Sequence, residues 1–354
     1  MSAATGWDGA RALVVGGAGF IGSNLTRALL DAGVARVTVV DNLLSAERSN
    51  VPNDPRVDYR EGSIADDALL GGLDKAVDYV FHLATFHGNQ NSIADPLADH
   101  ANNLLTTLKL LEWARGAAAV KKIVYAASGC VLAPHTSGDP TPVKEDGPAP
   151  FHLDSPYQIS KIVGEFYAVY YHAAHRLPTV RARFQNVYGP GEVLGAGRWR
   201  GTPATVWRNV VPTFVYRALL GQALILEGDG SSSRDFIYVD DIVRGLMACA
   251  SAGAPGDVYN LASGRETSIA DLAERINRLA ENPTPVARVP RRAWDHAGRR
   301  VGDTTKAERV LGFRAGVDID EGLRRTVAWT RTNRPLIQAC VDRHADRLAA
   351  AGAR

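Results

Sequence analysis

The chain has 354 residues, of which 45% are hydrophobic and 22% are charged, a globular balance that excludes extensive disorder. Forty lysines and arginines oppose 38 aspartates and glutamates, so the net charge of +2 does not indicate a nucleic-acid binder. The three cysteines, Cys130, Cys249 and Cys340, are too few for a disulfide framework and show no zinc spacing. We therefore expect no metal, a cytoplasmic location and, since no apolar run reaches about 20 residues, no membrane span.

Strand and helix patterns alternate along the first half of the chain. Short apolar runs predict strands at residues 11–15, 36–40, 57–61, 77–83, 122–127 and 179–183. Apolar residues at helical spacing follow the first strand, at Ile21, Leu25, Ala28 and Leu29, and recur over residues 104–113. Strands that alternate with helices imply an α/β fold, a Rossmann-type doubly wound parallel sheet with both faces covered.

A proline-rich polar loop, residues 134–150, interrupts this alternation before a helix that begins at Ser155. Ser155 is a typical N-cap, proline follows it at the first helical position, and Gln158 completes a capping box.

The second half of the chain mixes short strands, at residues 224–227 and 258–261, with a helix over residues 268–280. This looser pattern predicts a smaller α/β domain that is interleaved with the first. We expect a dinucleotide-binding domain over residues 1–185, a substrate domain over residues 186–330 with some chain crossing back, and a solvated helical tail over residues 331–354.

The first chemical signal is the turn Gly16-x-x-Gly19-x-x-Gly22 between the first strand and the first helix. Glycine permits a tight turn and close approach to a pyrophosphate, which then faces the free N–H groups of the helix. Asp41 ends the second strand about 20 residues later, where a carboxylate binds both adenosine ribose hydroxyls and repels a 2′-phosphate. The pattern predicts an NAD site rather than an NADP site, and a purely structural glycine turn is the weaker interpretation.

The second chemical signal is Tyr157, which lies four residues before Lys161 on the predicted helix, so the two side chains share a face. A nearby ammonium, and the positive nicotinamide ring of bound NAD⁺, would favour tyrosinate and make Tyr157 a general base. In isolation the pair would more often be an ordinary solvated Tyr/Lys pair. The dinucleotide-binding half that precedes it favours the catalytic interpretation.

Over roughly residues 12–330 the sequence resembles the extended short-chain dehydrogenases/reductases, specifically the nucleotide-sugar epimerases and dehydratases. The matching stretches are GGAGFIG at 16–22, HLA at 82–84, Asn103 before LLE at 110–112, Ser128, SPYQISK at 155–161, RFQNVYGPG at 183–191, GDGSSSRDFIYVDD at 228–241, YNLASG at 259–264 and DTTKA at 303–307. So many matches in the same order make the resemblance specific.

The resemblance implies a role for each matching residue. Tyr157 is implied as the acid/base, Lys161 as the group that holds the ribose and tunes Tyr157, and Ser128 as the partner of the reacting hydroxyl. The implied cofactor-binding set is Gly16, Gly19, Phe20, Ile21 and Gly22 at the pyrophosphate, Asp41 and Asn42 at the ribose, Ile64 at the adenine, and Leu83, Ala84 and Asn103 along the channel. The implied substrate-binding set is Ser128, Asn186, Asn209, Arg234 and a second diphosphate arginine, for which Arg299 is adopted and Arg292 stays open.

Several positions depart from the family pattern where the substrate would lie. Ser63 replaces an aspartate near the adenine, and residues 87–91 replace a usual Ala-Gly-Val-Arg-Tyr stretch. Residues 192–208 are longer than usual and rich in Trp and Arg, which leaves a lid, a dimer contact or an oligomer surface open, and the Trp residues favour a buried position. His87 is open between a sugar contact and a solvated histidine, whereas His82 and Cys130 are expected to be structural.

The resemblance also implies a reaction, in which the tyrosine takes a hydroxyl proton and NAD⁺ accepts the hydride from C4 of the sugar. The dehydratases use Asp-Glu directly after the Ser or Thr, and decarboxylases keep a glutamate there, but this chain has Gly129 and Cys130. The hypothesis is therefore a nucleotide-sugar 4-epimerase. Another nucleotide-sugar reaction (dehydratase, decarboxylase or reductase) is the alternative, and a non-catalytic NAD-binding regulator the remote one. A homodimer through helices near residues 100–115 and 157–175 is implied as well.

Overall fold

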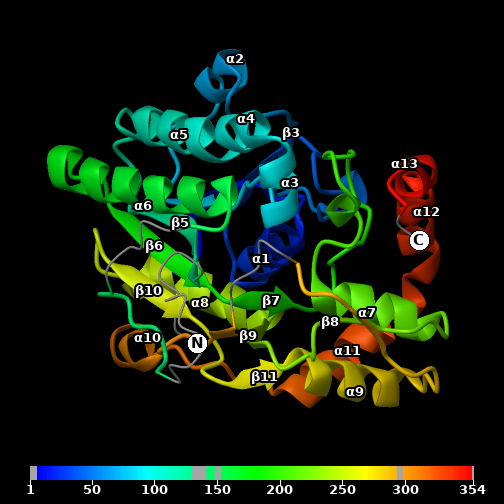
Figure 1. The fold of residues 1–354 in the computed structure, drawn as a ribbon. Helices are drawn as coiled ribbons and strands as arrows, with labels where there is room; N and C mark the ends of the chain where they lie inside the picture. The colour runs from blue at the N-terminus through cyan, green and yellow to red at the C-terminus, as the bar shows by residue number, and fades with distance from the viewer. Residues whose placement is uncertain (1–5, 130–140, 148–152, 293–297, 353–354) are drawn as a thin grey trace.

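The computed structural model describes residues 6–129, 141–147, 153–292 and 298–352, so Cys130 and most of the proline-rich loop lie outside the described residues. A seven-stranded parallel sheet forms the centre, in the order β10-β6-β5-β4-β1-β2-β3 (Figure 1). Its strands are β1 (Arg11–Val15), β2 (Arg36–Asp41), β3 (Val57–Glu61), β4 (Tyr79–His82), β5 (Lys122–Ser128), β6 (Thr179–Phe184) and β10 (Val258–Leu261). The predicted Rossmann-type fold is confirmed. The strand order reverses between β1 and β4, the point at which such sheets bind ligands.

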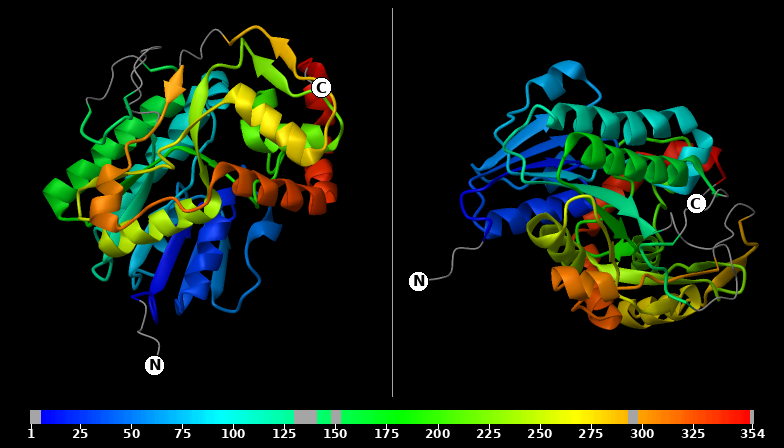
Figure 2. Two further views of the ribbon diagram at one scale, coloured as in Figure 1. Left: turned by 90° about the horizontal axis from the view of Figure 1, so that it is seen from below. Right: turned by 90° about the vertical axis from the view of Figure 1, so that its left-hand side faces the viewer.

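Helices cover both faces of the sheet, as Figure 2 shows. One face carries α1 (Phe20–Asp31), α8 (Val239–Ala252) and α10 (Thr305–Leu311), and the other carries α5 (Thr106–Ala114) and α6 (Pro156–His175). Apolar stripes drive this packing: Leu25 and Leu29 of α1 are fully buried on the first face, and Leu110 of α5 on the second. Shorter helical pieces are η1 (Arg48–Asn50), α2 (Asp67–Gly71), α3 (Asn89–Ala94), α4 (Pro96–Asp99) and the π-helical turn η2 (His100–Leu105).

The chain leaves the central sheet after β6 and builds a smaller second layer. Its middle strand, β9 (Ser233–Tyr238), pairs with β7 (Asn186–Tyr188), β11 (Glu266–Ser268) and β13 (Arg299–Arg300), and β8 (Ile225–Glu227) pairs with β12 (Ala287–Val289). Helices α7 (Val210–Leu219), α9 (Ile269–Ala280) and α11 (Ile319–Thr332) share a core with these strands. Because α8 and β10 lie between β9 and β11 in sequence yet pack on the central sheet, the chain passes from the second layer to the first and back.

Helix α6 begins as predicted, with one difference in its cap. The hydroxyl of Ser155 accepts a hydrogen bond from the backbone N–H of Gln158. The Gln158 side chain accepts from the N–H of Asp154 (2.8 Å) rather than from that of Ser155, the partner a capping box requires. The cap still satisfies free N–H groups at the helix start and fixes the turn that carries Tyr157.

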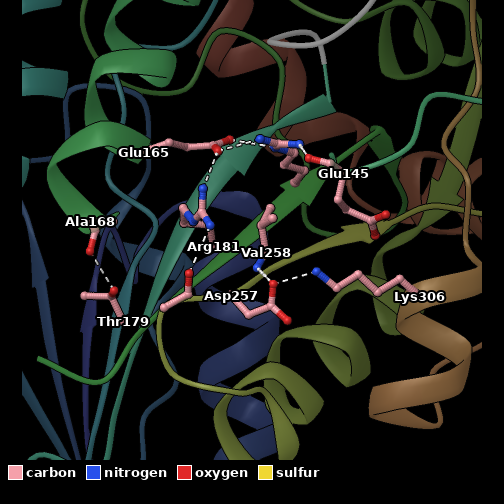
Figure 3. Close-up of polar contacts among 10 residues, drawn as sticks. Glu145, Glu165, Ala168, Thr179, Arg181, Asp257, Val258 and Lys306 are labelled. Atoms are coloured by element: carbon pink, nitrogen blue, oxygen red, sulfur yellow. Dashed lines mark hydrogen bonds and ion pairs between the residues drawn. The ribbon is translucent and has the colours of Figure 1, made fainter. Parts of the chain in front are cut away.

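A buried ion-pair network ties α6 to the sheet (Figure 3). The carboxylate of Glu165 accepts two hydrogen bonds from the guanidinium of Arg183 (2.7 and 2.8 Å) and a longer one from Arg181 (3.4 Å). Arg183 also donates to the backbone oxygen of Glu145 (2.9 Å), whose carboxylate accepts from the N–H of Asn260. Because both members of the central pair are buried, the network holds α6 in one position over β6.

The C-terminal tail is docked, so the expectation of a solvated tail helix is wrong. Its helices are α12 (Arg334–Asp342) and α13 (Ala345–Ala350), and Ile337 and Cys340 are each 1% exposed. With Val341 and Leu348 they form an apolar face that packs against residues 193–206. The arginines and alanines that separate these apolar residues hide the stripe in the sequence. Within the described part of the chain, no helix is long and apolar enough to cross a membrane.

Candidate active site

A cavity of about 340 Å³ opens at the carboxyl ends of the central strands and is closed by residues of the second layer. Fifteen of the predicted site residues line it: Gly16, Gly19, Phe20, Ile21, Gly22, Asp41, Asn42, Ile64, Leu83, Ala84, Ser128, Tyr157, Lys161, Asn186 and Asn209. The structure thus brings together residues that lie far apart in the sequence, at the edge where the strand order reverses.

The glycine-rich turn forms a cradle that larger residues would fill. Gly16 has a φ of +86°, and a Cβ there would lie 2.5 Å from the backbone nitrogen of Ala84. A Cβ on Gly22 would overlap the carbonyl oxygen of Gly16. Helix α1 follows with Gly19 as its N-cap and no side-chain cap, so N–H groups at its N-terminus remain for a ligand.

Asp41 ends β2 with a carboxylate that is only 9% exposed. One of its oxygens accepts from the N–H of Ala18 (3.0 Å) and the other from that of Leu43 (2.9 Å). Burial raises the pKa of Asp41, while these backbone hydrogen bonds oppose the rise. Each carboxylate oxygen retains acceptor capacity, which matches the two hydroxyls of a ribose.

Ser128, Tyr157 and Lys161 meet on one wall of the cavity. Ser128 ends β5, whereas Tyr157 and Lys161 lie on successive turns of α6. The ammonium of Lys161 is buried, donates to the carbonyl of Ala126 (3.0 Å) and lies 5.8 Å from the centre of the Tyr157 ring. The predicted i, i+4 relation therefore places both side chains toward the end of β5.

Asn103 does not line the cavity, and lies behind it. Its amide oxygen accepts from the N–H of Phe86 (2.6 Å) and from the hydroxyl of Thr85 (3.0 Å), and its amide nitrogen donates to Asp99 (2.6 Å). Asp99 also accepts from Ser160 of α6. Asn103 lies on the π-helical turn η2. Through Asp99 and Ser160 it links residues 85 and 86, which follow β4, to helix α6.

The predicted diphosphate arginines lie outside the lining of this cavity. Arg234 donates to the carbonyls of Ser233 (2.8 Å) and Gly298 (3.2 Å), Arg299 pairs with Glu266, and Arg292 pairs with Glu227. Arg300 lines the cavity instead, and its buried Nε has no hydrogen-bond partner among the described residues. Neighbouring residues of a strand face opposite sides, so the sequence could have named Arg300 only if the register of this short strand were known.

Three further side chains, His87, Glu192 and Arg208, form a polar wall of the cavity. The Nδ1 of His87, one carboxylate oxygen of Glu192 and the Nε of Arg208 are buried and lack partners among the described residues. The His87 ring lies 6.1 Å from that of Tyr157, and burial, aided by the cations of Arg208, Arg200 and Lys161, lowers the pKa of His87 to about 3. Sequence reasoning left His87 open and missed the other two, whose only signal was the atypical length of residues 192–208.

Glu192 is the most unusual member of this wall. It is 4% exposed, its other oxygen accepts from the amide of Asn209, and burial raises its pKa to about 7 against the opposing charge of Arg208. A carboxyl group with that pKa can donate or accept a proton near neutral pH. No group of three or more His, Cys, Asp or Glu side chains in the described ranges is arranged to hold a metal ion.

The model of the NAD dependent epimerase/dehydratase family matches residues 12–262. The chain belongs to this family. Its structure is similar to that of the Bordetella bronchiseptica enzyme WbmF in complex with NAD⁺ and UDP, with a TM-score of 0.88 and 57% identity over 97% of this chain and 99% of that one.

Two curated relatives carry different activities. A UDP-glucose 4-epimerase of Mycolicibacterium smegmatis is 32% identical over 91% of this chain and 98% of its own length. A dTDP-glucose 4,6-dehydratase of an Actinoplanes species has the same identity and the same coverage. The comparisons therefore show an NAD-dependent enzyme of nucleotide-sugar chemistry, and both reactions occur among its relatives.

The cavity of this epimerase/dehydratase fits NAD on its own geometry. The cradle at Gly16 and Gly22 leaves no room for side chains, the N-terminus of α1 is open, and Asp41 presents acceptors at the end of β2. Ile64 and Ser63 line the same end of the cavity, where a flat adenine would lie. Bound NAD supplies a hydride acceptor and donor there.

Replacing Asp41 by serine is expected to weaken NADH binding by about ten- to a hundredfold, because hydrogen bonds to a charged acceptor contribute ~1.5–3 kcal/mol. NADPH binding should fall much less, since the substitution also removes a charge that repels the 2′-phosphate. Fluorescence titrations with both nucleotides measure the ratio, with Asp74→Ser as a surface control. An unchanged preference for NADH would contradict the role of Asp41.

Proposed function

We propose that this protein is an NAD-dependent nucleotide-sugar 4-epimerase that works through a transient 4-keto sugar. The observation that carries the proposal is the pairing of an intact Ser128–Tyr157–Lys161 wall with Gly129. Gly129 has no side chain, and the side-chain amide of Gln185 lies where its Cβ would be, so the place next to Ser128 carries an amide instead of the acidic side chain that the resemblance associates with dehydration. This geometry supports the reaction that needs the fewest acid/base groups.

The proposed chemistry assigns one task to each residue of the wall. Tyr157 takes the proton of the 4-hydroxyl, and Ser128 holds the same oxygen by a hydrogen bond. The buried ammonium of Lys161, fixed by the carbonyl of Ala126, favours the tyrosinate. As Tyr157 takes the proton, the C4 hydride would pass to bound NAD, which gives the 4-keto sugar. Once the sugar has turned its other face, the same hydride would return to C4 and Tyr157 would give the proton back to the oxygen, so that the opposite configuration results.

The substrate proposed is a nucleoside-diphosphate sugar. Asn186, Asn209 and Arg300 line the cavity, and the Nε of Arg300, which has no hydrogen-bond partner among the described residues, is a potential donor for phosphate oxygens. We assign the second diphosphate contact to Arg300 rather than to Arg299, because Arg300 lines the cavity whereas Arg299 does not. Both guanidinium groups have a carboxylate partner, Asp154 at 3.7 Å for Arg300 and Glu266 for Arg299. Arg234 remains a proposed contact that requires its side chain to leave the carbonyls of Ser233 and Gly298.

A second candidate function is a nucleotide-sugar reaction that needs another acid/base group. The polar wall favours it, because Glu192 and His87 lie in the same cavity as Tyr157. Isotope exchange separates the two candidates. In a 4-epimerisation the hydride stays on the cofactor and returns to C4, whereas additional proton transfers at carbon bring in hydrogen from the solvent.

Incubation with a panel of nucleotide sugars in D₂O is expected to give a product with a changed H4 coupling and no carbon-bound deuterium, as read by NMR. Tyr157→Phe should lower the turnover by at least a hundredfold, since general acid/base catalysis contributes about 10²–10⁴. The variant should still bind NAD, because the cradle is intact.

Tyr167→Phe, on the same helix and outside the cavity lining, is the matched control and should keep full turnover. Deuterium at a ring carbon would reject simple 4-epimerisation in favour of the second candidate. Turnover of Tyr157→Phe within tenfold of the wild type would reject Tyr157 as the base.

Glu192→Gln tests the polar wall through the pH dependence of stability. Because the pKa of Glu192 is raised in the folded state, its contribution is complete below about pH 4.5 and is lost as the pH rises through about 7. The glutamine cannot ionise, so the variant does not lose this stability as the pH rises. The difference in melting temperature, variant minus wild type, should therefore be a few degrees larger at pH 8.5 than at pH 5.5. Exposed Glu274→Gln is the control, and an identical pH slope in Glu192→Gln and wild type would refute the assignment.

We also propose a homodimer that forms across the outer faces of α4 and α6. Leu97 is 81% exposed, and Phe166 and Tyr170, on one face of α6, are 58% and 56% exposed. An apolar strip of this kind on two neighbouring helices fits a self-complementary contact with a second copy.

Light scattering is expected to give twice the chain mass of 38.0 kDa for the wild type. Phe166→Asp should give the mass of one chain, because it places a charge in the apolar contact. A monomeric wild type would overturn the proposal.

A further inference from the structure

The loop after β2, residues 42–47, forms one side of the cofactor cavity and is called the cofactor loop below. Asn42, Leu44, Ser45 and Ala46 line the cavity, next to Asp41. The loop has no regular secondary structure, and Leu43 has a positive φ of 55°. Its position therefore depends on what holds it from outside.

Residues 193–208 hold the cofactor loop by its backbone, and are called the clasp. Arg198 donates from its N–H to Leu44 O (3.1 Å) and from its guanidinium to Asn42 O (3.1 Å). Arg200 donates to Leu44 O (3.2 Å) and Ser45 Oγ (2.6 Å), and Arg208 to Ser45 O (3.1 Å). Guanidinium groups that satisfy several carbonyls at once fix a loop far better than single hydrogen bonds.

The tail helices hold the clasp in turn. A Cβ on Gly195 would lie 2.6 Å from the carbonyl oxygen of Cys340 in α12, so the two backbones touch. The Nε2 of His344 lies 2.9 Å from the carbonyl of Gly195. On the other side, a Cβ on Gly197 would overlap the carbonyl of Leu44. The clasp is thus packed between α12 and the cofactor loop, as Figure 1 shows for the corresponding ribbons at the right of the molecule.

One ion pair connects the cofactor loop, the clasp and the C-terminal tail. The carboxylate of Glu47, at the end of the cofactor loop, accepts from the guanidinium of Arg343 (2.7 and 3.2 Å) and from the N–H of Gly197 (2.9 Å). Arg343 follows α12 and also donates to the carbonyl of Gly197 (3.3 Å). The hydrogen bonds from Arg343 and Gly197 hold the pKa of Glu47 below its ordinary value, so the pair is charged at neutral pH.

We propose that the clasp and the tail helices latch the cofactor loop, and that Glu47 and Arg343 act as positioning residues that slow the release of NAD. Neither residue lines the cavity. It acts by keeping the cofactor loop closed against the cradle at Gly16. This inference depends only on NAD being the cofactor and is independent of the reaction proposed above.

The test measures the release of NADH from the loaded protein by its loss of fluorescence after addition of excess NAD⁺. Arg343→Gln and Glu47→Gln should each release NADH about five- to tenfold faster than the wild type, and the double variant no faster than either one, since all three break the same link. Arg343→Lys should restore part of the retention, because an ammonium keeps the charge but not the two-pronged contact.

Arg324→Gln is the matched control, because it removes a surface ion pair with Glu321 on α11, away from the cavity. It should leave the release rate unchanged. Melting temperatures at saturating NAD exclude a general loss of stability as the cause. The proposal would be overturned if Arg343→Gln and Glu47→Gln released NADH at rates within twofold of the wild type. It would also be overturned if the increases in release rate of the two single variants multiplied in the double variant.

Discussion

The close approach of two backbones at the centre of the sheet is the constraint on which the site depends. The turn after β1 comes so near to residues 83 and 84, after β4, that a Cβ on Gly16 would lie 2.7 Å or less from the Ala84 backbone. Only a glycine with a positive φ satisfies this geometry. The same approach opens the N-terminus of α1 toward the cavity and aligns it with Asp41 at the end of β2. The cofactor, Tyr157 and the substrate groups are all placed relative to this cradle.

The sequence predicts the central layer well because each of its signals is local. Strands β1, β3 and β10 have the predicted bounds. Strands β1 and β10 are mostly apolar and buried, whereas β3 (VDYRE) is an edge strand with polar residues between its apolar ones. The glycine turn, Asp41 and the Tyr157–Lys161 pair also rest on spacings within one βαβ unit or one helix. Such spacings determine geometry without reference to the rest of the fold.

The predictions that differ from the structure depend on contacts between distant segments. Asn103 is a brace behind the cavity because a π-helical turn directs it to Phe86, and no sequence pattern shows that turn. Arg300 replaces Arg299 at the cavity because the register of a two-residue strand decides which one faces inward. The tail docks because Ile337 and Cys340 find apolar partners that lie more than a hundred residues earlier in the chain.

Residues 192–208 combine two tasks that the central layer does not perform. Glu192 and Arg208 belong to the polar wall and line the cavity together with Tyr157, and each has a buried polar atom without a partner in the described part of the chain. Arg208 also holds the backbone of Ser45 in the cofactor loop. The guanidinium of Arg208 cannot move without losing its hydrogen bonds to the carbonyls of Ser45 and Val193, and each bond lost would leave a buried polar group unsatisfied. This atypically long segment therefore connects the polar wall to the cofactor loop through Arg208. A substitution that displaces Arg208 would change the position of both.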